Sequence, residues 1–266
     1  RNSPSPGGSP AVGAIVRAII LTAGVGSRLT PHTDSTPKCL LEVGGKPLLR
    51  RYLEVLAALG IPEAVLVVGH MKEQVAAEVA QAPASIAVRL IENRQFIRGG
   101  ILSLWLARQD FDDEVLIMDA DVLFPQELLA RLLASPDANA IAVDEQFQDT
   151  GEESKVLCED GWVVEVARKI GQDAHPRGEA VGMLRLSAEA AEVLRGILDE
   201  LVESGKDSAD YQDAIRDLAV EVPIGVVEVG DLPWIGIDVE EDLIRARQQI
   251  LPQIERLDRG ESLPVA

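Results

Sequence analysis

A glycine-rich loop with two cationic residues lies just after the first apolar run of the chain. Residues 17–22 are mostly apolar and are followed by Gly24 and Gly26, a pattern typical of a buried strand that ends in a tight turn. In such a turn, backbone N–H groups can point at phosphate oxygens. Arg28 could bind two of these oxygens at once, and Lys38 could act as a point charge. We therefore predict a polyphosphate site; the alternative is a plain turn with two solvated cations.

Two better-known phosphate motifs do not fit this chain. Leu29 stands where the third glycine of a dinucleotide-binding fingerprint belongs, which disfavours an NAD-dependent oxidoreductase. The segment 44–47, Gly-Gly-Lys-Pro, lacks the Ser or Thr that follows the lysine of a P-loop. The chemistry of residues 21–38 must therefore be interpreted by itself.

Carboxylates follow two other apolar runs. Asp119 and Asp121 end one run, and Asp238 ends another. We expect only one of Asp119 and Asp121 to face a given cleft. Carboxylate oxygens at strand ends suit Mg²⁺, a hard cation; a helix cap or a solvated turn is the alternative. The acids at 240–242 begin a helical pattern, where negative charge stabilises the first turn.

The combined spacing resembles the signature of the nucleoside triphosphate transferase family. That family includes sugar-1-phosphate nucleotidyltransferases and the bacterial choline-phosphate and phosphonate cytidylyltransferases. Three later segments (117–122, 178–182 and 234–238) look closest to the cytidylyltransferase branch. The signature itself is carried by Gly24-x-Gly26-x-Arg28-Leu29, then Pro31-x-Thr33-x-x-x-Pro37-Lys38, then Gly45-Lys46-Pro47-Leu48-Leu49.

The resemblance implies a role for each matching residue. Arg28 and Lys38 would contact the triphosphate, and Asp121 and Asp238 would hold Mg²⁺. These four residues form the expected catalytic set. The nucleotide pocket would be lined by residues of three segments: Leu21, Thr22, Ala23, Gly24, Gly26 and Ser27, then Glu92 and Asn93, then Gly100 and Ser103.

On the acceptor side, the resemblance implies Lys169 and Glu179 as binding residues, although a solvated strand end would explain Lys169 nearly as well. Where choline-phosphate enzymes usually carry asparagine, this chain has Gly99 and Gly100. A quaternary ammonium group favours an aromatic cage, and only 3% of the chain is aromatic. Both points weigh against phosphocholine itself.

Together these residues predict a nucleotidyl transfer. An acceptor phosphate or phosphonate oxygen would attack the α-phosphorus in line and displace pyrophosphate. Mg²⁺ would offset the developing charge, and Arg28 and Lys38 would stabilise the leaving group. We expect a cytidylyltransferase that transfers CMP from CTP to an acceptor of the phosphocholine or 2-aminoethylphosphonate type. The alternatives are a sugar- or cyclitol-phosphate nucleotidyltransferase that uses another triphosphate, and an inactive relative that senses nucleotides.

Composition narrows the possible partners. The 266 residues include 44 acidic and 25 basic ones, for a net charge of −19, so nucleic acid is not expected as a partner. No apolar run reaches the about 18 residues that span a bilayer, so no membrane insertion is expected. Cys39 and Cys158 are widely separated, which indicates a reducing compartment and hence a cytoplasmic protein. A homodimer is left open.

The elements that must position these residues alternate between strands and helices. Short apolar runs predict strands, and the periodic segments between them predict helices. This alternation predicts a three-layer Rossmann-like α/β fold with a mixed, mostly parallel sheet. A hairpin is predicted at 154–166, around the turn Glu-Asp-Gly. The runs expected as strands are 17–22, 64–69, 86–91, 114–118, 154–158, 162–166, 181–186 and 224–229.

One domain is expected. Residues 1–16 are rich in Ser, Pro and Gly and would form a disordered leader. Residues 17–255 would form a single nucleotidyltransferase domain, with 17–135 binding the nucleotide and 136–255 the acceptor on one continuous sheet. Residues 256–266 would be a tail.

Overall fold

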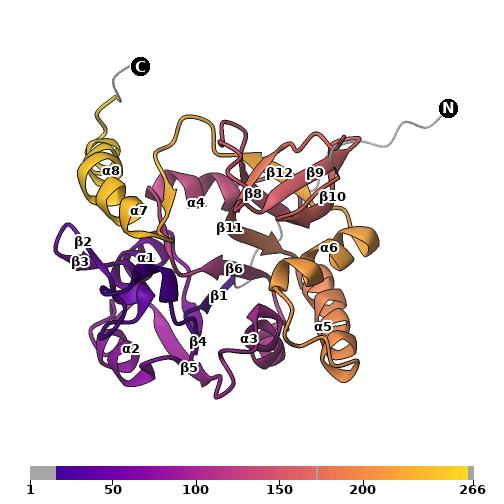
Figure 1. Cartoon of the computed structure of the whole chain (residues 1–266), viewed down its shortest axis with the longest axis horizontal. Coiled ribbons are helices and arrows are strands. Elements are labelled where there is room, and N and C mark those ends of the chain that lie inside the picture. Colours follow the sequence, from indigo (N-terminus) through magenta and orange to yellow (C-terminus); the bar gives the residue numbers. More distant parts are fainter. Residues whose placement is uncertain (1–15, 172, 263–266) are drawn as a thin grey trace.

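A nine-stranded mixed sheet forms the centre of the computed structural model (Figure 1). The structure describes residues 16–171 and 173–262, so the expected leader lies, apart from Val16, outside the described residues. The main path of the sheet is β10-β9-β11-β6-β1-β4-β5, and β8 and β12 extend it beside β11. The strands are β1 (Arg17–Leu21), β4 (Glu63–Val68), β5 (Ala87–Glu92), β6 (Val115–Asp119), β8 (Ala140–Asp144), β9 (Lys155–Glu159), β10 (Trp162–Ala167), β11 (Gly178–Leu186) and β12 (Gly225–Glu228).

The first half of the sheet is parallel. Strand β1 pairs in parallel with both β4 and β6, and Leu21 at its end stands opposite Val67 on one side and Asp119 on the other. Because parallel strands end at the same edge of a sheet, the glycine loop after β1 and the acidic segment after β6 begin side by side. This pairing places the residues predicted to bind phosphate and those predicted to bind metal at the same edge of the sheet.

The second half of the sheet is built around β11. This strand pairs antiparallel with β6, β8 and β9, while β9 and β10 form the expected hairpin. The two halves therefore share one sheet, in which β6 and β11 are neighbours. Strand β12 adds in parallel to β8.

Helices cover both faces of the sheet and make three layers. Alternate residues of β1 supply the two cores: Ala18 and Ile20 pack on one face and Ile19 on the other, as the two-residue period of a strand requires. The first face carries α1 (Leu48–Ala58), α2 (Lys72–Val79) and α4 (Gln126–Leu133); the second carries α3 (Gly100–Leu106), α5 (Ala188–Glu203) and α6 (Tyr211–Glu221). The expected three-layer α/β fold is confirmed.

A third apolar cluster joins the C-terminal helices to the first half of the chain. Leu251 and Ile254 of the last helix are buried with Leu29, Leu48 and Ile237, and α7 and α8 lie beside α1 in Figure 1. The last helix continues past the expected boundary at residue 255. The elements of this region are β2 (Glu42–Val43), β3 (Lys46–Pro47), β7 (Val122–Leu123), β13 (Ile235–Gly236), α7 (Glu240–Arg245), a π-helical turn (Ala246–Ile250) and α8 (Leu251–Asp258).

None of the helices in the described part of the chain has the length and apolar character that crossing a bilayer requires.

Candidate functional site

The glycine loop after β1 is fixed at both ends. The Thr22 hydroxyl donates to the Val67 carbonyl at 2.8 Å, which ties the start of the loop to β4. Gly26 has φ of 67°, and a Cβ there would lie 3.1 Å from side-chain carbons of both Lys38 and Thr33. The Thr33 hydroxyl also donates to the Gly26 carbonyl at 2.8 Å. Glycine at 26 therefore lets the loop pack directly against Lys38.

A small antiparallel pair brings the two predicted metal-binding acids together. Strand β7 follows Asp121 and pairs with β13, which precedes Asp238. The Ile237 N–H continues this pairing by donating to the Asp121 carbonyl at 2.9 Å. The Asp242 side chain in turn accepts the Asp238 N–H at 3.0 Å. These backbone bonds hold the two aspartates on adjacent strands.

The ammonium group of Lys38 lies between these two carboxylates. Its Nζ donates to Asp121 and to Asp238, both at 2.7 Å, and an Arg28 nitrogen lies 2.8 Å from the same Asp238 oxygen. Burial alone would lower the pKa of Lys38, but the two carboxylates outweigh it and raise that pKa. Burial would likewise raise the pKa of Asp238, but Lys38 and Arg28 lower it. The four residues of the expected catalytic set therefore form one contiguous cluster.

The donor set of this cluster fits a magnesium ion. Two carboxylate oxygens already converge on one cationic atom, Lys38 Nζ. Within residues 16–171 and 173–262, no group of three or more His, Cys, Asp or Glu is arranged to hold a metal. Two protein carboxylates suffice for Mg²⁺, because this ion usually keeps several waters and takes further oxygens from substrate phosphates. Asp121 and Asp238 would be its protein ligands.

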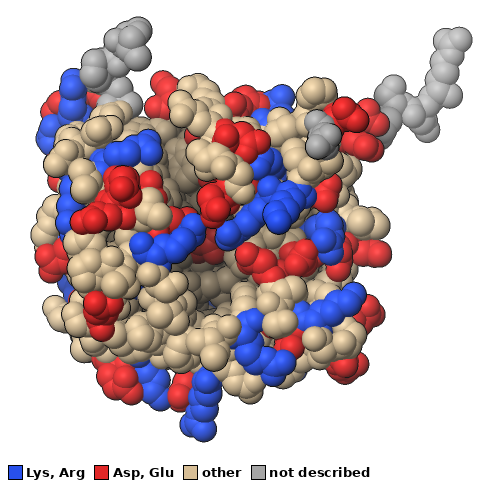
Figure 2. All heavy atoms as spheres, viewed as in Figure 1, with Lys and Arg blue, Asp and Glu red and all other residues tan. Residues whose placement is uncertain are grey.

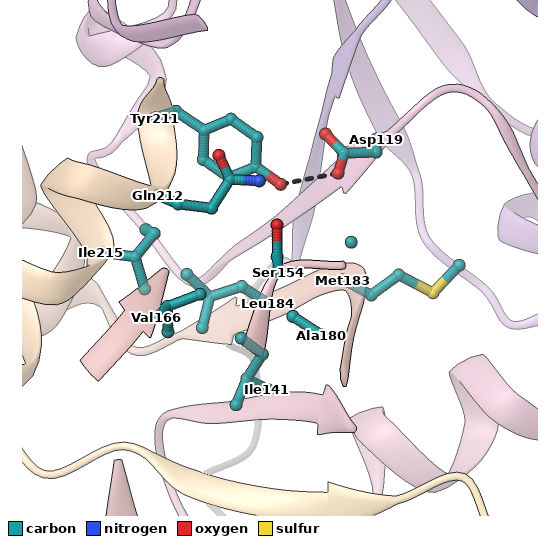
Figure 3. Close-up of a pocket in the computed structure, with 11 residues that line it drawn as sticks. Asp119, Ile141, Ser154, Val166, Ala180, Met183, Leu184, Tyr211, Gln212 and Ile215 are labelled. Atoms are coloured by element: carbon teal, nitrogen blue, oxygen red, sulfur yellow. Dashed lines mark hydrogen bonds between the residues drawn. The ribbon is translucent and has the colours of Figure 1, made fainter. Parts of the chain in front are cut away.

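Asp119 faces a different partner from Asp121. Its carboxylate accepts a hydrogen bond from the Tyr211 hydroxyl at 2.8 Å (Figure 3). Gly182 has φ of 79°, and a Cβ there would lie 2.6 Å from the Asp119 carboxylate. Burial, followed by the charge of Asp121, raises the pKa of Asp119 to about 8. Among the described residues Asp119 makes no ion pair.

A cavity of about 50 Å³ lies beside Asp119 and Tyr211. Its walls combine a carboxylate and a hydroxyl with aliphatic side chains, as Figure 3 shows. A space of this size holds a few water molecules or a small polar group. The lining residues drawn around it include Ser154, Val166, Leu184, Gln212 and Ile215.

The other predicted nucleotide-binding residues lie along the same edge of the sheet, and two of them touch each other. Asn93, 1% exposed, follows β5, and its amide donates to the Ser103 hydroxyl on α3 at 3.0 Å. Gly100 begins α3, where a Cβ would lie 3.0 Å from the Tyr211 backbone nitrogen. Glu92 differs from these residues, because it is exposed and pairs with Lys72 at 2.8 Å.

The two predicted acceptor residues have different surroundings. Lys169 is exposed and makes no ion pair within the described chain, whereas its neighbour Arg168 lies 3.7 Å from Asp210 and 4.0 Å from Glu152. The buried Lys155 donates to the Arg168 carbonyl at 3.2 Å, which fixes the backbone there. Arg168 also helps to lower the pKa of Asp238. Arg168, rather than Lys169, therefore lies toward the site. The sequence alone did not indicate which of these two adjacent cations does so.

Glu179 lies in a groove of about 610 Å³ that also reaches Arg28 and Asp238. Burial raises its pKa to about 7, and the negative charges of Glu153, Asp144 and Asp238 add to the effect. Figure 2 shows acidic and basic side chains around a hollow in this face of the molecule. The groove is therefore rich in carboxylates next to the cationic cluster.

Comparison with known proteins agrees with this geometry. Residues 18–178 match the model of the MobA-like NTP transferase domain. The chain belongs to this family. The expectation of a nucleotidyltransferase is thereby confirmed at the level of the family.

Its relatives include cytidylyltransferases. The chain is 31% identical, over 256 residues, to CMP-5'-(3-aminopropyl)phosphonate synthase of Streptomyces rubellomurinus, covering 93% of this chain and 41% of that protein. It is 29% identical to the choline-phosphate cytidylyltransferase of Streptococcus pneumoniae, covering 89% of this chain and 98% of that protein. The solved structure of a CTP:phosphocholine cytidylyltransferase from Streptococcus pneumoniae superposes with a TM-score of 0.72 at 25% identity, covering 88% of this chain and 98% of that one. The chain thus spans less than half the length of the first of these relatives.

Proposed function

We propose that this NTP transferase is a Mg²⁺-dependent cytidylyltransferase that transfers CMP from CTP to a short phosphonate or phosphorylated alcohol bearing an amine. The observation that carries the proposal is the convergence of Lys38, Arg28, Asp121 and Asp238 beside the glycine loop. An inactive, nucleotide-sensing relative would not need this cluster. The use of CTP is supported by the names of the relatives.

Each part of the site would have its own role in the transfer. Bound Mg²⁺ would supply a Lewis acid that orients the phosphates and offsets their charge. Arg28 and Lys38 would bind phosphate oxygens and stabilise the departing pyrophosphate, because placed cations act strongly where charge develops. Arg168, on the acceptor side, would hold the acceptor phosphonate against the α-phosphorus. A phosphate or phosphonate oxygen is largely ionised near neutral pH, so the reaction does not require a general base.

An amine on the acceptor is supported by carboxyl groups near the cluster that lack a cationic partner within the described chain. Asp119 lacks an ion-pair partner in the described chain, and Glu179 lies in a groove with Asp144 and Glu153. Carboxylates in such positions are costly unless a cation pairs with them. An ammonium group at the far end of a short acceptor would supply that cation. The two named relatives fit this view, since aminopropylphosphonate and phosphocholine both carry a cationic nitrogen.

The direct test is pyrophosphate release in the presence of Mg²⁺. CTP, UTP, GTP and ATP would each be combined with 2-aminoethylphosphonate, 3-aminopropylphosphonate, phosphocholine, inositol-1-phosphate and glucose-1-phosphate. We expect turnover with CTP and an aminoalkylphosphonate. Ethylphosphonate, which has the same reacting group without the amine, serves as the matched control and should react much more slowly.

Other outcomes would redirect the proposal. Turnover with inositol-1-phosphate or glucose-1-phosphate would keep the chemistry and assign the chain to the sugar or cyclitol branch. Nucleotide binding without pyrophosphate release across the whole panel would contradict the proposed acceptor class and favour a sensing role.

A further inference from the structure

The hydroxyl of Tyr52 is buried directly behind the segment that carries Asp121. The chain contains two tyrosines, and Tyr52, on the inner face of α1, is 1% exposed. Its Oη lies 2.8 Å from the carbonyls of both Asp119 and Val122. The same oxygen accepts the Val122 N–H at 3.0 Å. One side chain therefore contacts backbone groups on both sides of Asp121, accepting from the Val122 N–H and sharing its single proton between the two carbonyls.

The same segment is held from its other side by β13. There the Ile237 N–H donates to the Asp121 carbonyl at 2.9 Å, and Gly236 pairs with Val122. The short stretch between Asp119 and Val122 thus lies between the Tyr52 hydroxyl and the strand that leads to Asp238. Its backbone position decides how far apart the two carboxylates stand.

We propose that Tyr52 is a positioning residue, whose hydroxyl fixes the Asp119–Val122 backbone so that Asp121 and Asp238 can bind one metal ion together. This inference rests on the proposed role of these aspartates as metal ligands. Groups that orient metal ligands without touching the metal commonly control affinity. Tyr52 does so through the backbone of the ligand segment.

The hydroxyl, rather than the ring, carries this role. The Tyr52 ring packs edge-on against Phe124, with centroids 4.9 Å apart and an interplanar angle of 85°, and phenylalanine would retain that contact. Burial raises the pKa of Tyr52 well above its ordinary value, so the hydroxyl stays protonated and able to donate. Without it, the Val122 N–H would be left unpaired in an apolar interior, and the segment would shift to find another partner.

The test is the binding of Mn²⁺, a magnesium substitute visible by electron paramagnetic resonance, to the full chain with α,β-methylene-CTP. This analogue cannot be cleaved at the reacting bond, so the measurement is independent of turnover. For Tyr52→Phe we expect Mn²⁺ affinity to fall about tenfold, the lower end of the range for groups that orient metal ligands. In turnover assays the half-saturating Mg²⁺ concentration should rise similarly, and excess Mg²⁺ should restore most of kcat.

Two further variants separate the possible failures. Leu56→Val, also on α1 and fully buried, should reduce stability without touching the segment, and should leave Mn²⁺ affinity unchanged. If Tyr52→Phe lowers the melting temperature but binds Mn²⁺ as the parent does, the positioning role is wrong. If Asp121→Asn also binds Mn²⁺ normally, the metal assignment in the proposed function fails instead.

Discussion

At the scale of single residues, the ammonium group of Lys38 bridges the carboxylates of Asp121 and Asp238. Its Nζ is 2.7 Å from an oxygen of each carboxylate. Without a cation between them, the two carboxylates would repel each other at short range. Lys38 and Arg28 together offset the charge of the two carboxylates, and removing any of the four side chains alters the electrostatics of the others.

Asp121→Asn and Asp238→Asn should each abolish most turnover while leaving the fold intact. The amide keeps the size of the carboxylate but loses the charge that a metal ligand needs. Initial rates at several Mg²⁺ concentrations, together with circular dichroism, would measure both properties. Glu127→Gln, which removes an exposed carboxylate paired with Arg131, is the matched control and should keep full activity. Parental rates in both aspartate variants would remove the metal-site assignment.

Arg168 and Lys169 provide a contrast between adjacent cations. Both are exposed, but Arg168 lies near Asp210 and Glu152, whereas Lys169 makes no ion pair within the described chain. If Arg168 binds the acceptor phosphonate, Arg168→Ala should raise the acceptor KM about tenfold, because charge-assisted hydrogen bonds contribute about 1.5–3 kcal/mol, and leave the CTP KM nearly unchanged. Lys169→Ala should change neither constant much. The reverse result would restore Lys169 as the acceptor-binding residue.

Glu179 should give acceptor binding a pH dependence. Burial, with the neighbouring carboxylates, raises its pKa to about 7. Below that pH the group is neutral and above it carries the charge that attracts an ammonium group. The KM for 2-aminoethylphosphonate should therefore fall as pH rises through about 7, and Glu179→Gln should remove this component. Glu179→Gln assayed with the same acceptor corrects for titration of the phosphonate. A Glu179-dependent slope with ethylphosphonate as well would contradict ammonium recognition.

At the scale of elements, the candidate site is formed by loops that follow the ends of parallel strands and lie close to one another. In residues 17–135, apolar runs mark the strands, so the sequence predicted the order of strands and helices in this half well. Strand β8 was not predicted, because its five residues, Ala140–Asp144, include only a four-residue apolar run, two of whose members are alanines. The convergence of Asp121 and Asp238 could only be tested in the structure, since it depends on the two-residue strands β7 and β13, which are too short to show a period. The contact of Tyr211 with Asp119 joins segments that are far apart in the sequence, so no local sequence pattern predicts it.

Gly26→Ala should damage this loop beyond the cost of its backbone conformation. The added methyl would lie 3.1 Å from carbons of Lys38 and Thr33 and push Lys38 away from the aspartates. Gly45 has a similar φ of 73° with open space around it, so Gly45→Ala is matched for backbone strain, about 1 kcal/mol. Both variants should lose stability through backbone strain, while only Gly26→Ala should also lose most of its kcat. Equal kcat values in the two variants would show that crowding of Lys38 does not matter.

At the scale of the whole molecule, the C-terminal helices pack against segments from the first half of the chain. Leu251 and Ile254 of α8 pack with Leu29, next to Arg28, and with Ile237, next to Asp238. This apolar cluster therefore joins the glycine loop to the segment that leads to Asp238, the second proposed metal ligand. We therefore expect residues near the end of the chain to contribute both to stability and to the relative position of the proposed catalytic groups. A domain boundary at residue 255 would fall inside α8, the helix that makes these contacts.

Ile254→Ala should test whether this packing matters for function. The side chain is 3% exposed, and replacing a buried isoleucine by alanine typically costs about 2–5 kcal/mol. Because the cavity would lie between α8 and the segments beside Arg28 and Asp238, we also expect a higher half-saturating Mg²⁺ concentration. Urea unfolding followed by circular dichroism would give the stability loss, and initial rates would give the metal dependence. Glu255→Ala, an exposed neighbour on the same helix, should change neither. A large stability loss with an unchanged metal dependence would mean that α8 supports the fold and leaves the spacing of the aspartates to β7, β13 and Tyr52.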